Sequence, residues 1–155
     1  DKWRARPFVS QSNCFVVPPL KFASDACKCL EVAVHGGMPV LLLSAGQAGA
    51  TAPAAIAGAL VQQVAECLAG LAYVNAIKPG HPAIFGLWCF VSDLRSGAMS
   101  GGSPEQVLLS SASAQMAHFY NLTGELRRVL AIQNFLTHNL VLKRESTMHL
   151  SATPA

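Results

Sequence analysis

Charged residues are scarce in this sequence. Only 12% of its 155 residues are Asp, Glu, Lys or Arg, about half of the roughly 25% that is usual in soluble domains. Hydrophobic residues make up 52%, so we expect either a piece of a larger core or a chain that buries much of its surface against something else. The net charge of +3 and the absence of a basic stripe with interleaved aromatic residues argue against a nucleic-acid-binding surface.

The sequence also lacks a long uninterrupted apolar run and a leader segment. Residues 32–65 contain no Asp, Glu, Lys or Arg, but Gly, Pro, Ser and Gln interrupt them, and no stretch of about 18 continuous apolar residues occurs. We therefore expect no membrane-spanning helix. The chain begins at Asp1 without a basic-then-apolar signal segment, so we expect an internal fragment of a longer cytoplasmic protein.

No motif for a metal site or a disulfide framework is present. The five cysteines are odd in number and irregularly spaced among apolar neighbours, at positions 14, 27, 29, 67 and 89. This favours reduced, buried thiols. The five histidines do not pair with Cys or acidic residues at the spacing of metal ligands, so we predict no bound metal.

Strand and helix patterns alternate three times along the chain. The expected strands are 13–20, 39–45 and 83–90, and the expected helices are 22–37, 51–73 and one that begins after Ser103. Alternation of this kind predicts parallel strands with helical crossovers, and therefore an α/β fold. Three such units do not close a barrel of eight, so they form either an open doubly wound sheet or an arc of a barrel.

Helix start and stop signals support these assignments. Ser24 is a candidate N-cap of the first helix, and Gly36-Gly37 supplies its stop. Ser103 as N-cap, Pro104 as the first helical residue and Gln106 two residues later together predict a capping box for the last helix.

In either architecture the functional site lies on the strand-end loops. The candidates are residues 44–53, residues 91–106 and the start of the chain, 5–13. The Gly-rich loops lack the Lys of a P-loop and the spacing of a dinucleotide fingerprint. Ser100 lacks the G-x-S-x-G environment, because Ala98 and Gly102 flank it. We therefore assign neither phosphate binding nor a serine nucleophile.

Two interpretations remain open for the most conspicuous side chains. Asp93 and Arg95 either hold their loop as an ion pair or cap, or orient a substrate or partner. The aromatic residues are predicted to be core, with a role for Trp88 or a phenylalanine in a cage for an alkylated ammonium as the alternative; they are Phe8, Phe15, Phe85, Trp88 and Phe90.

Longer stretches of the sequence closely resemble the trimethylamine methyltransferase family, which includes pyrrolysine-containing and pyrrolysine-lacking members. The stretches are "WRARPFVSQSNCFVVPPLKFA", "GGMPVLLLSAGQAGATAPAA", "YVNAIKPG" and "FVSDLRSGAMSGGSPEQ". The resemblance runs from Trp3 to about Tyr120. Leu87 and Cys89 depart from it, since the family is expected to have Thr and Pro there.

The resemblance implies a fold and a reaction. The chain would be part of a (β/α)8 TIM barrel, about three βα units long. The full-length enzyme, a homo-oligomer, would transfer a methyl group from a tertiary or quaternary amine to the cobalt of a separate corrinoid protein. The corrinoid (cobalamin) would be carried by that partner and not by this chain. No catalytic residue can be assigned, and Trp88, Asp93, Arg95 and Ser100 are candidates to face the substrate or the corrinoid.

The resemblance ends near residue 121, which divides the chain into a partial barrel domain, 1–121, and a tail, 122–155. If the codons of residues 124–141 are read from their third bases, the genetic code permits "GVAAGLGDPKLPDAQSG", which resembles the continuation of the family. We hypothesise that the tail is a frameshifted reading, which the nucleotide sequence would test. The alternative functions are an inactive truncated fragment of the enzyme and a small-molecule-binding α/β module.

Overall fold

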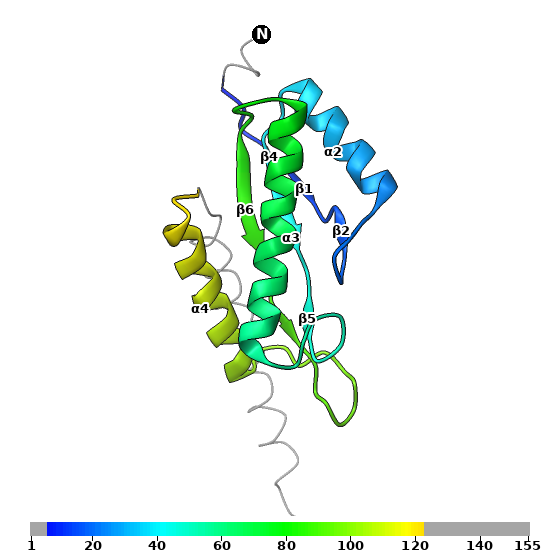
Figure 1. Ribbon diagram of the computed structural model, residues 1–155, viewed down its shortest axis with the longest axis vertical. Helices are drawn as coiled ribbons and strands as arrows, with labels where there is room; N and C mark the ends of the chain where they lie inside the picture. The colour runs from blue at the N-terminus through cyan, green and yellow to red at the C-terminus, as the bar shows by residue number, and fades with distance from the viewer. Residues whose placement is uncertain (1–5, 123–155) are drawn as a thin grey trace, which may run out of the picture.

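A computed structural model describes residues 6–122 of the chain (Figure 1). Strands β1, β4 and β6 form a parallel sheet in that order, β2 pairs with β3 antiparallel, and β5 pairs with β7 parallel. The elements are β1 (Gln11–Asn13), β2 (Val16–Val17), β3 (Lys21–Phe22), α2 (Ser24–Gly36), β4 (Val40–Ser44), β5 (Gln47–Ala48), α3 (Ile56–Ile77), β6 (Ala83–Leu87), β7 (Phe90–Val91) and α4 (Pro104–Phe119). The predicted α/β fold with parallel βαβ units is confirmed.

The central strand β4 is buried along all five of its residues. It pairs with β1 on one edge and with β6 on the other, with Leu42 aligned with Asn13 and Phe85. A strand between two parallel neighbours, covered on both faces, is typically a continuous apolar run, and this run is what the sequence predicted at 39–45.

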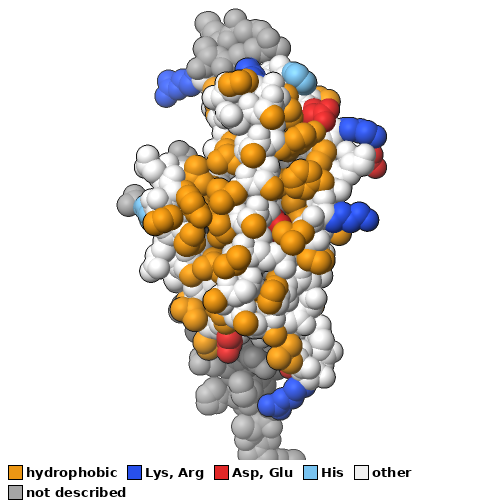
Figure 2. All heavy atoms as spheres, in the orientation of Figure 1, with side chains coloured by type: hydrophobic (Ala, Val, Ile, Leu, Met, Phe, Trp, Pro, Cys, Tyr) orange, Lys and Arg blue, Asp and Glu red, His pale blue; other side chains and the backbone are white. Residues whose placement is uncertain are grey.

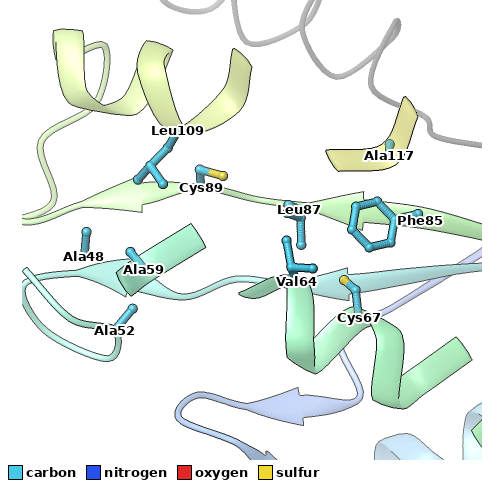
Figure 3. Close-up of a cluster of buried hydrophobic side chains, with 10 residues drawn as sticks. All are labelled: Ala48, Ala52, Ala59, Val64, Cys67, Phe85, Leu87, Cys89, Leu109 and Ala117. Carbon is cyan, nitrogen blue, oxygen red and sulfur yellow. The ribbon is translucent and has the colours of Figure 1, made fainter. Parts of the chain in front are cut away.

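The three helices pack against the same face of this sheet. Leu42 belongs to one hydrophobic cluster with Leu30 of α2 and Val74 of α3. Phe85, its neighbour on β6, belongs to a second cluster that includes α3 residues and Leu109 of α4 (Figure 3). Since aligned residues of neighbouring strands point to the same face, α2, α3 and α4 lie on one side of the sheet.

The opposite face of the sheet carries Leu41 and Leu43, because successive side chains of a strand alternate. Both are buried, yet among residues 6–122 neither belongs to a cluster with the helices. Gly86 of β6 gives them room: a Cβ there would lie 2.8 Å from Leu41 Cδ1 and 2.9 Å from Leu43 Cδ2. This face therefore also carries apolar side chains, which close over Gly86.

Three predicted elements have other bounds in the structure, and the helix expected at 51–73 spans Ile56–Ile77. The strand expected at 13–20 is interrupted, because Pro18 and Pro19 have no N–H for a ladder and the chain turns into the β2–β3 hairpin. The helix expected from Thr51 begins at Ile56, since the backbone N–H groups of residues 50–52 all donate to the Gln47 carbonyl in a tight turn. The strand expected at 83–90 divides into β6 and β7.

The helix caps agree with the sequence except at Ser24 and in one hydrogen bond of the predicted capping box. That serine is the first residue of α2, and Ala23 occupies the N-cap without a side-chain hydrogen bond. Gly37 ends α2 with a left-handed φ of 80°, as glycine at this position often does. At α4 the Ser103 Oγ accepts from the Gln106 N–H at 3.2 Å, while Gln106 Oε1 accepts from the N–H of Gly102 rather than of Ser103.

Helix α3 is long and apolar enough to cross a membrane by length and composition alone, which the sequence analysis did not anticipate. The same test is passed by core helices of soluble proteins, and α3 packs on β4 and β6 between α2 and α4. Its only charged residue, Glu66, is buried, so its outer side carries no charge. Figure 2 shows hydrophobic side chains spread over this face of the molecule.

The predicted tail, 122–155, lies outside the described residues except for Leu122. The frameshift hypothesis for residues 124–141 concerns that part of the chain and stays a prediction.

Candidate functional site

Two loops meet where β4 and β6 end. Gln47 and Ala48, after β4, pair with Phe90 and Val91, after β6. The Gln47 side-chain amide donates to the Ser92 Oγ at 2.7 Å. The predicted loops 44–53 and 91–106 are therefore fixed side by side at one end of the molecule (Figure 1).

The third predicted loop, 5–13, does not belong to this end. Residues 11–13 form β1, and the Gln11 N–H donates to the carbonyl of Pro39, just before β4 begins. This segment therefore leads into the opposite end of the parallel sheet. The hairpin of β2 and β3, which follows β1, takes its place. The hairpin was not predicted, because residues 13–20 were expected to form one strand.

The two loops and the first turns of α3 and α4 enclose a cleft of about 460 Å³. Three of the four predicted site residues line it: Asp93, Arg95 and Ser100. The cleft is also lined by Ala48, Gly49, Ala54, Ile56, Val91, Ser92, Leu94, Ser103 and Glu105. Trp88 is not among its lining residues.

Asp93 closes a tight turn. Its Oδ1 accepts from the Arg95 N–H at 2.9 Å, and its backbone carbonyl accepts from the Gly97 N–H at 2.7 Å. The Arg95 N–H, followed by the Ser96 hydroxyl, lowers the pKa of this carboxyl below its usual value. Within residues 6–122 the Arg95 guanidinium forms no ion pair and is exposed beside the cleft, while Asp93 caps the loop through the Arg95 N–H.

Ser100 and Trp88 differ in their surroundings. The Ser100 N–H donates to the carbonyl of Val91 at 2.7 Å, which closes the loop. Trp88 lies just after β6 with 41% of its surface exposed, and its ring meets Phe90 edge-on at a centroid distance of 6.5 Å.

The prediction that the aromatic residues belong to the core is confirmed for Phe15 and Phe85. It is wrong for Trp88 and Phe8, which are exposed.

A buried polar cluster on α3 was missed. Glu66 is 2% exposed, and its carboxylate accepts from Ser44 Oγ at 2.5 Å, from the Leu20 N–H at 2.9 Å and from Gln62 Nε2 at 3.1 Å. Gln63 is fully buried, and its side-chain amide has no hydrogen-bond partner among residues 6–122. Three polar residues within the five positions of "QQVAE", inside an otherwise apolar helix, were the available signal.

Neither a disulfide nor a cluster of metal ligands occurs within residues 6–122. All five cysteines are free, and Cys67 and Cys89 are fully buried. Within residues 6–122 no group of three His, Cys, Asp or Glu could hold a metal ion.

Comparison with known proteins decides the family. The sequence model described as trimethylamine methyltransferase (MTTB) matches residues 1–131. The chain belongs to the trimethylamine methyltransferase family. Glycine betaine methyltransferase of Desulfitobacterium hafniense (strain Y51) is 44% identical over 104 residues, which are 67% of this chain and 22% of the relative.

Two further relatives carry other substrates in their names. Proline betaine:corrinoid methyltransferase of Eubacterium limosum is 33% identical over 122 residues, 79% of this chain and 25% of that protein. Trimethylamine methyltransferase MttB1 of Methanosarcina mazei is 35% identical over 122 residues, 79% of this chain and 24% of that protein. This chain therefore spans between 22% and 25% of the length of these relatives.

Proposed function

We propose that this chain forms part of an enzyme that transfers a methyl group from a tertiary or quaternary amine to the cobalt of a separate corrinoid protein. Membership of the trimethylamine methyltransferase family supports the reaction. The names of its relatives include trimethylamine and two betaines as substrates and a corrinoid as acceptor. The substrate is therefore a methylated amine, and the corrinoid belongs to the partner protein.

The winding of the chain supports an arc of a (β/α)8 TIM barrel. Strand order β1-β4-β6 follows the order of the chain, and α2, α3 and α4 pack on one face. A doubly wound sheet carries helices on both faces and reverses its strand order, whereas a barrel keeps all helices outside. The barrel proposal rests on this arrangement of all three helices on one face of the sheet. In the barrel, Leu41 and Leu43 would face the interior, and the cleft would lie at the barrel mouth.

The reaction needs positioning more than covalent chemistry. The partner's reduced cobalt supplies the electron pair that forms the cobalt–carbon bond, and the carbon–nitrogen bond breaks with its pair going to the departing amine. The chain's part is to hold the amine in line and to keep water out. Loops fixed by the Gln47–Ser92 hydrogen bond and the Asp93 turn are suited to this, because they do not need to be ordered on binding.

We assign Trp88, Asp93, Arg95 and Ser100 to contacts with the substrate or the corrinoid protein. Trp88 presents an exposed ring, and ring faces attract alkylated ammonium groups. Arg95 has a guanidinium that forms no ion pair within residues 6–122, and guanidinium groups bind carboxylates in a two-point geometry. A betaine carries both an alkylated ammonium and a carboxylate, whereas trimethylamine has no carboxylate, so Arg95 would favour betaines.

Methyl transfer to free cob(I)alamin tests the proposal. The longest protein product of the gene is mixed with cob(I)alamin and with methyl-labelled trimethylamine, glycine betaine or proline betaine. We expect label in methylcobalamin with at least one of them. If no label appears with any amine while the Desulfitobacterium hafniense enzyme transfers it from glycine betaine in the same buffer, the proposed reaction is wrong.

The 155-residue chain alone is expected to be inactive. In the described part β1 and β6 are the edges of the sheet, and an open sheet does not enclose a barrel mouth. Methyl transfer by this chain alone would contradict the barrel proposal, and an amine that raises its melting temperature without transfer would favour a binding module. We further propose a homo-oligomeric enzyme in the cytoplasm, where free thiols persist.

A further inference from the structure

Glu66 is a carboxylate buried on an otherwise uncharged helix. It is the only charged residue of α3, and 2% of its surface is exposed. Burying a carboxylate is costly for folding unless hydrogen bonds compensate the lost hydration, and an apolar side chain at this helix position would avoid that cost. The presence of Glu66 is therefore better explained by the groups that it binds than by packing.

The carboxylate of Glu66 binds segments that follow two different strands. Its Oε2 accepts from the hydroxyl of Ser44, the last residue of β4, at 2.5 Å. Its Oε1 accepts from the Leu20 N–H at 2.9 Å, in the hairpin that follows β1, and from Gln62 Nε2 at 3.1 Å. Gln62 Nε2 also donates to the carbonyl of Thr51 at 2.9 Å, in the loop before α3. One buried side chain therefore fixes the segments after β1 and β4 to α3.

Ser44 extends this connection to the segment after β6. The ladder between β4 and β6 ends with Ser44 aligned with Leu87, and the carbonyl of Ser44 then accepts from the Trp88 N–H at 2.8 Å. Ser44 is fully buried. Because its hydroxyl binds Glu66 and its carbonyl binds the tryptophan backbone, Ser44 joins the buried carboxylate to Trp88 through two hydrogen bonds.

We propose that Glu66 is a positioning residue, which acts through Ser44 to place the Trp88 ring against the alkylated ammonium of the substrate. The inference rests on the proposed function, in which Trp88 contacts the amine. A ring attracts a cation that lies over its face, and a misplacement of about 1 Å in a reacting complex can lower the rate by about 10²-fold. The contribution of Glu66 is to keep the end of β4, and with it the backbone of Trp88, from shifting.

Two substitutions break this connection from its two ends. Ser44→Ala removes the hydroxyl that binds Glu66 and keeps the carbonyl that binds Trp88, whereas Glu66→Leu removes the carboxylate. In the full chain that the gene encodes, with cob(I)alamin and the amine that the unaltered protein uses, each should lower kcat/KM by about tenfold, largely through KM. Glu66→Gln should keep most of the activity, because an amide can accept from the Leu20 N–H and donate to the Ser44 hydroxyl. The assays are run well below the melting temperature of each variant.

A double-mutant cycle distinguishes positioning of Trp88 from general stabilisation of the fold. In a Trp88→Leu background, Ser44→Ala should lower kcat/KM further by less than about twofold, since residues that act through one contact are not additive. A residue that only stabilises the fold would cause the same loss in both backgrounds. Glu31→Gln on α2 is the matched control, because the Glu31 carboxylate also accepts from a hydroxyl, that of Tyr73. It should leave KM unchanged.

Equal losses in the two backgrounds, or full activity of the folded Ser44→Ala protein, would overturn the inference. A loss with Glu66→Gln as large as that with Glu66→Leu would also overturn it, since the charge of Glu66 rather than its hydrogen bonds would then matter. If Glu66→Leu does not fold, the Ser44→Ala cycle decides by itself. These outcomes leave the proposed function intact, whereas absence of transfer by the unaltered protein would overturn the proposed function and the inference with it.

Discussion

At the scale of single residues, the contact between Phe15 and Gly70 holds the hairpin against α3. Glycine weakens a helix, but here a methyl group would overlap the Phe15 ring, which is fully buried. A helical glycine is thus explained by the close approach of an aromatic ring. Sequence alone did not predict this contact, because it depends on a hairpin that the sequence analysis did not recognise.

Gly70→Ala should lower the free energy of unfolding by about 1–3 kcal/mol, the usual cost of overpacking a core. Urea denaturation followed by the fluorescence of the tryptophans measures it. Gly36→Ala near the end of α2 is the control, since a Cβ there meets nothing within 4 Å. It should be neutral or stabilise by about 0.4–1 kcal/mol. Equal effects of the two substitutions would contradict the described contact between Phe15 of the hairpin and Gly70 of α3.

The two buried thiols should be protected from alkylation. Burial raises the pKa of Cys67 from 9.0 to about 12 and that of Cys89 to about 11, and only the thiolate reacts. At pH 8, iodoacetamide should label the exposed Cys29 and spare Cys67 and Cys89 until the chain unfolds, as peptide mass spectrometry would show.

The same pKa values set a pH dependence of stability. A group whose pKa is raised on folding stabilises the protein below its unfolded pKa, and that contribution is lost as pH rises through the folded value. The free energy of unfolding should therefore fall from about pH 9 to pH 12. In the iodoacetamide experiment, rapid labelling of Cys67 in the folded chain at pH 8 would show that the described core is wrong.

At the scale of elements, the sequence correctly predicted those strands and helices that local residue patterns determine. The apolar run of β4 and the Ser103-Pro104 start of α4 were correct. The start of α3 was misplaced because the carbonyl of Gln47 accepts from the N–H groups of residues 50–52, a local turn that composition does not reveal. Strand β1 was missed because its three residues, Gln11–Asn13, are polar and show no strand pattern. Their pairing with β4 is what makes them a strand.

The N-cap of α4 should contribute measurable stability. Ser103→Ala leaves the Gln106 N–H without its acceptor and should cost about 1 kcal/mol. Ser111→Ala, at an exposed position in the middle of α4, should change stability by less than about 0.5 kcal/mol. Thermal or urea denaturation of the two variants provides the comparison, and a larger loss for Ser111→Ala would contradict the assigned start of the helix.

At the scale of the whole molecule, the sequence predicted the location of the candidate site better than the set of residues around it. Parallel strands bring their following loops to one end, so loops 44–53 and 91–106 were found together with Asp93, Arg95 and Ser100. The hairpin after β1 and the buried Glu66 were not predicted, since both depend on which face of α3 meets which segment. Two apolar surfaces account for the scarcity of charged residues. One is the sheet face that carries Leu41 and Leu43, and the other is the uncharged outer side of α3.

Exchange of the matching quarter of a relative tests the central claim most directly. The 104 residues that match glycine betaine methyltransferase of Desulfitobacterium hafniense are inserted in place of their counterparts in that enzyme. If this chain is an arc of the same barrel, the soluble chimera should melt cooperatively and transfer methyl groups from glycine betaine to cob(I)alamin. A soluble, cooperatively melting chimera without any methyl transfer would contradict the account.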